Sequence, residues 1–161
     1  ANVVVVTKCP THMQPIDRRI VSNTLQLASY QHLFYSSIGY APIHLNGTPL
    51  IVTGIANPMP LLTHLQQQYP DTELLAYPDH HIFTPQDVNR IMQKAEQYVC
   101  VVTTEKDYMR LLQTPLVEQL GDKLHVISIQ TNLGIDKEAF DRQILLYVSE
   151  NNRTQPNITT L

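Results

Sequence analysis

The 161-residue sequence has little of what several common protein classes need. It contains only 5 glycines and 2 cysteines, and only 16% of its residues are charged. No glycine stands in a G-x-x-x-x-G-K-[ST] or G-x-G-x-x-G pattern, so a self-contained phosphate-binding loop of either usual kind is missing. Cys9 and Cys100 have no metal-ligand spacing and make no disulfide framework, which favours a reducing compartment.

Membrane spans and nucleic-acid-binding patterns are also missing from the sequence. The 11 Lys+Arg against 14 Asp+Glu give a net charge of −3, whereas nucleic-acid binding needs clustered cations. No run of about 18 apolar residues is present that would cross a bilayer, and no signal-peptide pattern precedes the first strand. The length predicts one domain, or one domain with an appended piece. Because the chain opens on Ala1 directly before a strand, we expect a piece of a longer protein.

What is present is an alternation of strand and helix patterns. The β-branched run 3–6 is typical of a strand buried on both faces, and a helix is predicted over 15–27. Residues 32–50 read as a two-stranded ribbon, with a hairpin turn at Asn46-Gly47. The further predicted strands are 50–53, 73–77, 99–103 and 124–129, and the helices are 58–69, 85–98, 105–112 and 137–149. This order predicts an α/β three-layer sandwich with a mostly parallel sheet.

Ligands of open parallel sheets bind beyond the carboxyl ends of the strands, so the residues that follow each strand are candidates for a site. At the first such junction Gly54 permits a tight turn, Asn57 is expected to cap a helix, and Pro58 is expected at its first position. The alternative is that the free N–H groups of this helix start face an anion. Both interpretations remain open.

The second junction runs from Thr104 to Asp107. These two residues resemble a capping box at a helix start, which is a purely structural role. Lys106 has no such role and is a cation near the end of a strand, where it could contact a phosphate. The sequence leaves structure and function equally open here.

The third junction holds Asp79, His80 and His81. A helix start is already supplied by Thr84 and Asp87, so the earlier three residues are not needed as caps. A carboxylate beside two imidazoles places a titratable base next to a group that fixes its tautomer. The same trio could donate metal ligands. We therefore expect this junction to carry chemistry.

Taken together, these junctions resemble the C-terminal part of the tetraacyldisaccharide 4'-kinase, or lipid A 4'-kinase, family. Each matching landmark is weak alone, but four in the family's order are a specific signal. They are Val5-Val6-Thr7-Lys8-Cys9-Pro10, Gly54-Ile55-Ala56-Asn57-Pro58, Pro78-Asp79-His80-His81 followed by Phe83-Thr84, and Thr104-Glu105-Lys106-Asp107.

The resemblance implies a two-domain enzyme of the P-loop class. Such an enzyme transfers the γ-phosphate of ATP, with Mg²⁺, to the 4'-hydroxyl of a lipid A disaccharide precursor, a tetraacyldisaccharide 1-phosphate. The Walker A loop, the magnesium ligands and an aspartate base belong to an N-terminal domain that this chain lacks. The implied domains are 1–30 as the end of the nucleotide-binding domain, 31–49 as a linker ribbon, 50–150 as the C-terminal α/β domain, and 151–161 as a polar tail.

The same resemblance implies three groups of site residues. The catalytic group is His80 together with the adjacent Asp79, and His81 is the second candidate for the catalytic histidine. Thr7 and Lys8 resemble the strand-end element that recognises the nucleotide base. Four residues are expected to contact the substrate phosphate or to shape the cleft: Lys106, Thr104, Asn57 and Gly54.

Without its other half, the chain is expected to be soluble, to bind no cofactor or metal, and to transfer no phosphate. The apolar strand 3–6 would then lack part of its sheet, so we expect self-association through this strand or the ribbon. The intact protein is expected at the cytoplasmic side of the bacterial inner membrane, peripheral or anchored by its N-terminus.

Two other functions remain open. One is a metal-dependent phosphoesterase of the Asp-His-His type, although such sites need more aspartates, commonly as Asp-x-Asp, and the sequence has no such pair. The other is a non-catalytic α/β binding module.

Overall fold

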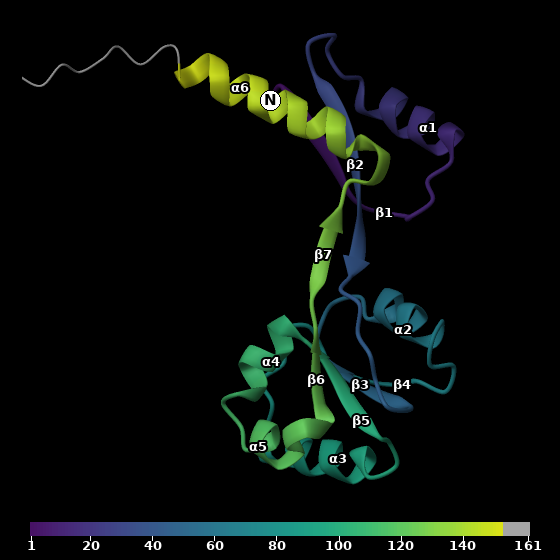
Figure 1. Ribbon diagram of the computed structural model, residues 1–161, viewed down its shortest axis with the longest axis vertical. Helices are drawn as coiled ribbons and strands as arrows, with labels where there is room; N and C mark the ends of the chain where they lie inside the picture. Colours follow the sequence, from purple (N-terminus) through teal and green to yellow (C-terminus); the bar gives the residue numbers. More distant parts are fainter. Residues whose placement is uncertain (153–161) are drawn as a thin grey trace, which may run out of the picture. The chain divides into compact units, whose positions relative to one another are not determined.

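The structure is a computed structural model that describes residues 1–152, which divide into two compact units. Unit 2 is the continuous segment Tyr40–Gln130, and unit 1 combines Ala1–Gly39 with the segment from Thr131 onward. The chain thus leaves unit 1, forms all of unit 2 and then returns (Figure 1).

Unit 2 is built on a four-stranded sheet in which every neighbouring pair is parallel. Its order is β4-β3-β5-β6, with β3 at Pro49–Thr53, β4 at Glu73–Ala76, β5 at Cys100–Thr104 and β6 at Leu124–Ile127. The two central strands, β3 and β5, are buried along their whole length. Their continuous apolar runs suit central parallel strands, which are covered on both faces.

Both faces of this sheet carry helices. Leu50 and Val52 pack into one apolar cluster, while the intervening Ile51 packs into another on the opposite face. The first cluster includes side chains of α3 (Pro85–Ala95), α4 (Glu105–Leu111) and α5 (Leu116–Leu120), and the second includes side chains of α2 (Met59–Gln66). The predicted α/β class with a mostly parallel sheet is confirmed.

Most residues of a second, three-stranded sheet belong to unit 1. Its order is β1-β2-β7, formed by Val3–Cys9, His32–Tyr40 and Ile129–Asn132, and β1 pairs with β2 in parallel. The helices of unit 1 are α1 (Pro15–Leu25), the short 3-10 turn η2 (Gly134–Asp136) and α6 (Lys137–Asn152).

The segment after Thr131 belongs to unit 1 because it is bonded to α1 and β2. Asp136 accepts two hydrogen bonds from the Arg18 guanidinium, at 2.9 and 3.0 Å, and Phe140 meets Phe34 edge-on at 5.3 Å between ring centroids. The compact units divide the chain at other positions than 30, 49 and 150, the predicted domain boundaries, which stay a prediction about the whole protein. No local pattern in the sequence revealed these distant contacts.

The hairpin predicted at Asn46-Gly47 is wrong. β2 pairs with β1 and β7, whereas β3 pairs with β4 and β5, so the two flanking strands lie in different sheets. Gly47 instead allows the backbone to pass close to the side chain of Val99, since a Cβ on Gly47 would lie 2.6 Å from Cγ2 of Val99. The predicted strand 124–129 is also divided at Ser128, whose carbonyl oxygen accepts the Ala41 N–H at 3.0 Å.

Three smaller expectations need correction. α2 begins at Met59, one residue later than predicted, with Pro58 in the capping position and Asn57 outside the helix. The helix α5 was not predicted. Val5 keeps 37% of its surface exposed, so β1, an edge strand of its sheet, is not buried on both faces as predicted. Of the predicted tail, residues 153–161 lie outside the described residues.

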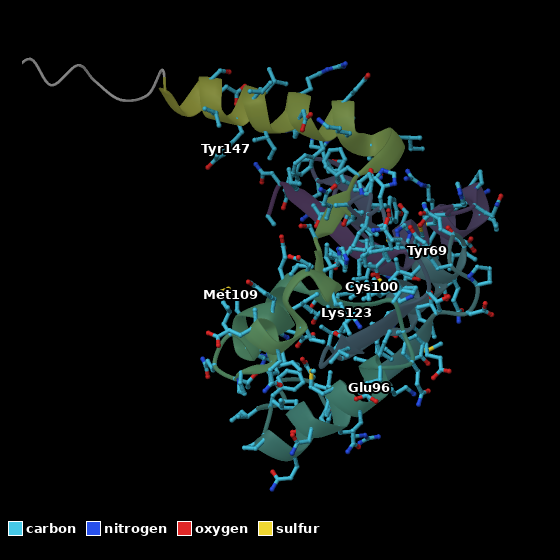
Figure 2. All side chains as sticks on the ribbon, turned by 60° about the horizontal axis from the view of Figure 1, so that its bottom comes forward. Tyr69, Glu96, Cys100, Met109, Lys123 and Tyr147 are labelled. Carbon is cyan, nitrogen blue, oxygen red and sulfur yellow. The ribbon has the colours of Figure 1, made fainter. Side chains whose placement is uncertain are left out.

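Both cysteines are free thiols. Cys9 is half-buried and its Sγ lies 3.4 Å from the Val6 carbonyl oxygen. Cys100, at the first position of β5, is buried inside unit 2 (Figure 2), and this burial raises the pKa of its thiol. A buried thiol of raised pKa is unreactive, so Cys100 contributes packing.

Candidate functional site

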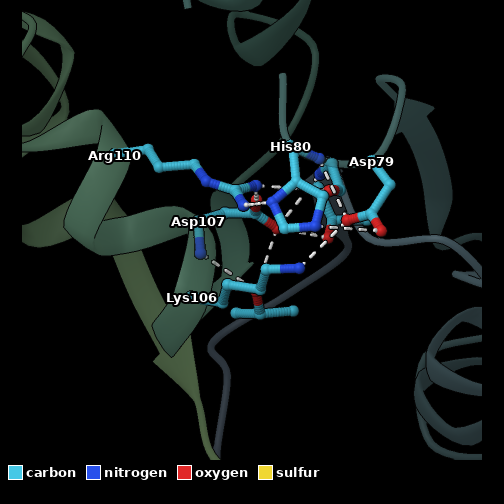
Figure 3. A network of polar contacts seen from close by, with 8 residues as sticks. Asp79, His80, Lys106, Asp107 and Arg110 are labelled. Carbon is cyan, nitrogen blue, oxygen red and sulfur yellow. Dashed lines mark hydrogen bonds and ion pairs between the residues drawn. The ribbon is translucent and has the colours of Figure 1, made fainter. Parts of the chain in front are cut away.

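Polar side chains from three strand ends lie together at one edge of the unit 2 sheet (Figure 3). β4 follows β3 on one side and β5 follows on the other, so the winding of the chain reverses between β3 and β5. Ligand crevices of open parallel sheets form at such reversals, beyond the carboxyl ends of the strands. Gly54 follows β3, Asp79 follows β4 and Asp107 follows β5, and hydrogen bonds connect the three loops.

Asp107 is the buried centre of this site. Its side chain is 0% exposed, and its Oδ2 accepts hydrogen bonds from the Thr53 hydroxyl at 2.6 Å, the Thr104 hydroxyl at 2.9 Å and the Gly54 N–H at 3.0 Å. Its Oδ1 accepts from Nη1 of Arg110 at 3.0 Å. With four donors around it, this carboxylate ties β3, β5 and α4 together, which is a structural role.

Gly54 allows the loops after β3 and β4 to approach each other closely. A Cβ at this position would lie 3.0 Å from the carbonyl oxygen of Pro78 and 3.4 Å from Oδ1 of Asp107. The first of these atoms is backbone and has no rotamer to move away. A larger residue would therefore separate the two loops.

Arg110 connects the buried carboxylate to the surface of the site. Besides Asp107, its Nη1 donates to the Gly54 carbonyl oxygen at 3.3 Å, and its Nη2 lies 3.2 Å from Nδ1 of His80 (Figure 3). The guanidinium thus contacts residues that follow β3 and β4 while it is anchored on α4.

His80 is the most accessible member of the cluster, with 75% of its side chain exposed. Its backbone is left-handed, with φ of 60°, a conformation that costs a residue other than glycine about 1 kcal/mol. The loop holds it there because Oδ1 of Asp79 accepts the His80 N–H at 3.0 Å. Its Nε2 lies 3.5 Å from Oδ2 of the same carboxylate.

Lys106 lies on α4 and forms an ion pair with Asp79 in the loop after β4. The sequence alone did not indicate this partner. The Nζ of Lys106 lies 3.0 Å from Oδ1 of Asp79, and this hydrogen bond is the main reason that the pKa of Asp79 is lowered. The Lys106 side chain is 46% exposed, so it remains accessible from the solvent side of the site.

His81 has a different environment from His80. Its ring stacks on Tyr77 at 4.7 Å and meets Phe83 edge-on at 5.2 Å. Its Nε2 lies 2.9 Å from Oδ2 of Asp87, the residue that closes the capping box with Thr84 at the start of α3. The capping box was predicted, but the involvement of His81 in it was not, and this histidine is partly buried, with 23% of its side chain exposed.

The other predicted site residues lie apart from this cluster or in the other unit. The Asn57 side chain is exposed and does not cap α2. Thr7 and Lys8 are exposed residues near the end of β1, and Lys8 has a left-handed φ of 59°. Neither residue lines the cavity of about 450 Å³ in unit 1, which is formed by residues 9–14, directly after Lys8, together with residues of α1, of β2 and of the turn before α6.

Neither a metal cluster nor a membrane-spanning helix is found in the part of the chain that the structure describes. Among residues 1–152, no three His, Cys, Asp or Glu side chains are grouped so as to hold a metal ion. Over the same residues, no helix combines the length and the apolar character that crossing a bilayer requires.

A family model described as tetraacyldisaccharide-1-P 4'-kinase matches residues 1–149. The chain belongs to this family. Curated relatives named tetraacyldisaccharide 4'-kinase agree with the assignment, and three of them align over 94 to 95% of the chain. They are from Phocaeicola vulgatus (34% identical), Flavobacterium johnsoniae (33%) and Bacteroides thetaiotaomicron (32%).

The chain spans about half the length of these curated kinase relatives, 46 to 48% of each. No solved structure matches it significantly. Membership of the tetraacyldisaccharide 4'-kinase family therefore comes from sequence similarity, and the geometry of the site comes from the structure described above.

Sequence reasoning about this family member missed Arg110 and Thr53. Arg110 stands three residues after Asp107, a spacing that brings two helical side chains together, so this pair could have been found. Thr53 ends a buried strand and gave no sign that its hydroxyl donates to the same carboxylate.

Proposed function

We propose that this chain forms part of a kinase that transfers the γ-phosphate of ATP to the 4'-hydroxyl of a tetraacyldisaccharide 1-phosphate, a lipid A precursor. The observation that carries the proposal is the match of residues 1–149 to the tetraacyldisaccharide-1-P 4'-kinase family. The polar cluster after β3, β4 and β5 supports it, because it lies where open parallel sheets bind ligands.

In this proposal His80 is the catalytic residue of the chain. It is the exposed imidazole of the cluster, and its left-handed backbone is the type of strain that often accompanies a functional side chain. Asp79 holds the His80 backbone, and Lys106 supplies positive charge near an incoming phosphate. Thr104 and Gly54 shape the site through Asp107. His81 supports the start of α3 through Asp87, and Asn57 has no assigned role.

The parts that act directly on ATP belong to another segment of the whole protein. Phosphoryl transfer depends on cations and N–H groups placed around the phosphates. Residues 1–152 do not fit a magnesium site, since they contain no group of three candidate ligands. We therefore assign the Walker A loop, the magnesium ligands and the aspartate base to an N-terminal domain, so that this chain alone transfers no phosphate.

The nucleotide base, in the same proposal, lies near Thr7 and Lys8. The cavity in unit 1 supports this assignment, because its lining begins at Cys9, the residue after Lys8. Residues 1–30 would then be the end of the nucleotide-binding domain, and 31–49 would contain a strand of the linker between the domains. The whole protein would work at the cytoplasmic side of the bacterial inner membrane.

An exposed edge follows from the same assignment. β1 lies at the edge of its sheet with Val5 partly exposed, so the chain without its preceding domain would associate with a second copy. Sedimentation over a range of concentrations tests this, and a monomer at every concentration would contradict it.

The kinase proposal is tested on the full-length protein with labelled ATP, Mg²⁺ and the tetraacyldisaccharide 1-phosphate. We expect a 4'-phosphorylated product, and a kcat lowered about 10²- to 10⁴-fold by His80→Ala. His44→Ala, which removes an exposed histidine of unit 2, is the matched control and should leave kcat unchanged. Absence of product with the unmodified protein would reject the kinase, whereas an unchanged kcat in His80→Ala would reject only the role of His80.

A further inference from the structure

Arg110 is held firmly before it reaches His80. Its Nη1 donates to Oδ1 of Asp107 at 3.0 Å and to the carbonyl oxygen of Gly54 at 3.3 Å, and its side chain is 22% exposed. Asp107 is in turn fixed by three other donors. The guanidinium is therefore anchored on two loops, which leaves Nη2 to meet the histidine ring at 3.2 Å (Figure 3).

The chemistry of the two side chains determines where the imidazole proton lies. A guanidinium carries only donors and stays protonated, so a favourable contact at 3.2 Å requires Nδ1 of His80 to accept. The ring proton must then lie on Nε2. The charged groups that face the ring are consistent with this, because the carboxylate of Asp79 lies on the Nε2 side at 3.5 Å and holds Lys106 on its other oxygen.

We infer that Arg110 is a positioning residue that fixes His80 as the tautomer with the proton on Nε2. The histidine then serves the reaction as a hydrogen-bond donor through Nε2, not as a base through Nδ1. The 3.5 Å separation from Asp79 is long for a hydrogen bond, so Nε2 remains able to donate to an oxygen of a phosphate or carboxylate in the cleft. This inference rests on the proposed function for its catalytic part, whereas the tautomer itself does not.

The tautomer is measured directly by ¹⁵N–¹H correlation spectra of the full-length protein labelled at histidine. His80→Gln identifies the signals of this residue by their loss. At about pH 8.5, where an ordinary histidine is uncharged, we expect a single tautomer with the proton on Nε2. In Arg110→Met the signals should shift towards an average over both tautomers, while Arg90→Met, an exposed arginine of α3, should change nothing. A proton on Nδ1 in the unmodified protein, or identical spectra in Arg110→Met, would overturn the inference.

Kinetics then separate this inference from the proposed function. We expect Arg110→Met to lower kcat about 10-fold with little change in KM, Arg110→Lys to restore part of the loss, and His80→Ala with Arg110→Met to be no slower than His80→Ala alone. Additive losses in the double variant would show that Arg110 does not act through His80. If His80→Ala itself has full activity, the proposed catalytic role fails, and the spectra still decide whether Arg110 sets the tautomer.

A second pair of variants does not depend on Arg110 and so avoids disturbing the buried carboxylate. The side-chain amide of glutamine can occupy the position of Nε2, and that of asparagine the position of Nδ1. We expect His80→Gln to keep at least ~10-fold more activity than His80→Asn. Asparagine tolerates the left-handed backbone of position 80 better than glutamine does, so a weaker asparagine variant is not a folding effect. Equal or higher activity in His80→Asn would contradict a donor at Nε2.

Discussion

Lys106 reaches from α4 to the loop after β4, where its Nζ lies 3.0 Å from Oδ1 of Asp79. The same carboxylate oxygen accepts the N–H of His80. One exposed ion pair therefore connects the cation of the second junction with the histidine of the third. Because both partners are accessible to water, the pair orders the loop without adding much to the stability of the fold.

Removing this cation should change the titration of Asp79 but not the unfolding equilibrium. The hydrogen bond from Lys106 is the first cause of the lowered pKa of Asp79, so Lys106→Met should return that pKa towards its ordinary value. Carboxyl ¹³C titration measures the change, and chemical denaturation should show an unaltered midpoint. A pKa of Asp79 that stays low in Lys106→Met would mean that the ion pair is absent in solution.

Asp107 should behave in the opposite way, as a residue required for stability. Asp107→Ala leaves the hydroxyls of Thr53 and Thr104 and the guanidinium of Arg110 without their shared acceptor in a buried place. We expect the free energy of unfolding to fall by about 3 to 5 kcal/mol. Asp71→Ala, at an exposed aspartate of the same unit, is the control in urea denaturation. A loss below about 1 kcal/mol would show that water replaces the carboxylate.

Much of unit 2 could be predicted because its rules are local. The continuous apolar runs of β3 and β5 indicate buried parallel strands, and the intervening helices have clear patterns. The meeting of Gly54, Asp79 and Asp107 follows from topology, since parallel strands end at one edge. These predictions needed no knowledge of individual side-chain contacts.

What could not be predicted depends on distant partners. The sheet partners of β2 include β7, which lies at the far end of unit 2 in the sequence. Gly47, in the predicted hairpin turn, lies close to the side chain of Val99, a contact that no local pattern indicates. His81 resembles His80 in the sequence, but its ring packs against the aromatic rings of Tyr77 and Phe83 and is mostly covered, whereas the His80 ring is exposed. Periodicity does not distinguish two adjacent histidines with such different environments.

The start of α3 should weaken in acid. Burial opposes ionisation of Asp87, but hydrogen bonds from Thr84 and His81 outweigh it, so the pKa of Asp87 is lowered in the folded protein. A lowered folded-state pKa gives stability that is present above the unfolded-state value and is lost as the pH falls through the folded-state value. The stability difference between the unmodified protein and Asp87→Asn should therefore be constant near neutral pH and shrink below about pH 4. Urea denaturation across this range measures it, and a difference that grows in acid would exclude an ionised Asp87.

The attachment of α6 to unit 1 should depend on Asp136. Its carboxylate accepts two bonds from Arg18 and one from the backbone N–H of Tyr35 at 2.9 Å, so it joins α1, β2 and the turn before α6. We expect Asp136→Ala to accelerate amide hydrogen exchange in α6 about 10-fold or more, since the loss of these bonds costs at least ~1.4 kcal/mol of local stability.

The matched control for Asp136 is Asp141→Ala, which removes an exposed ion pair with Lys137 within the same helix. Such an exposed pair contributes little to stability because water screens it, so exchange in α6 should rise by less than about 3-fold. Amides of β3 and β5, inside unit 2, should exchange at the same rate in both variants, because the Asp136 bonds lie entirely within unit 1. Faster exchange that extends equally over both units would mean that Asp136 supports the whole chain instead of the attachment of its last helix.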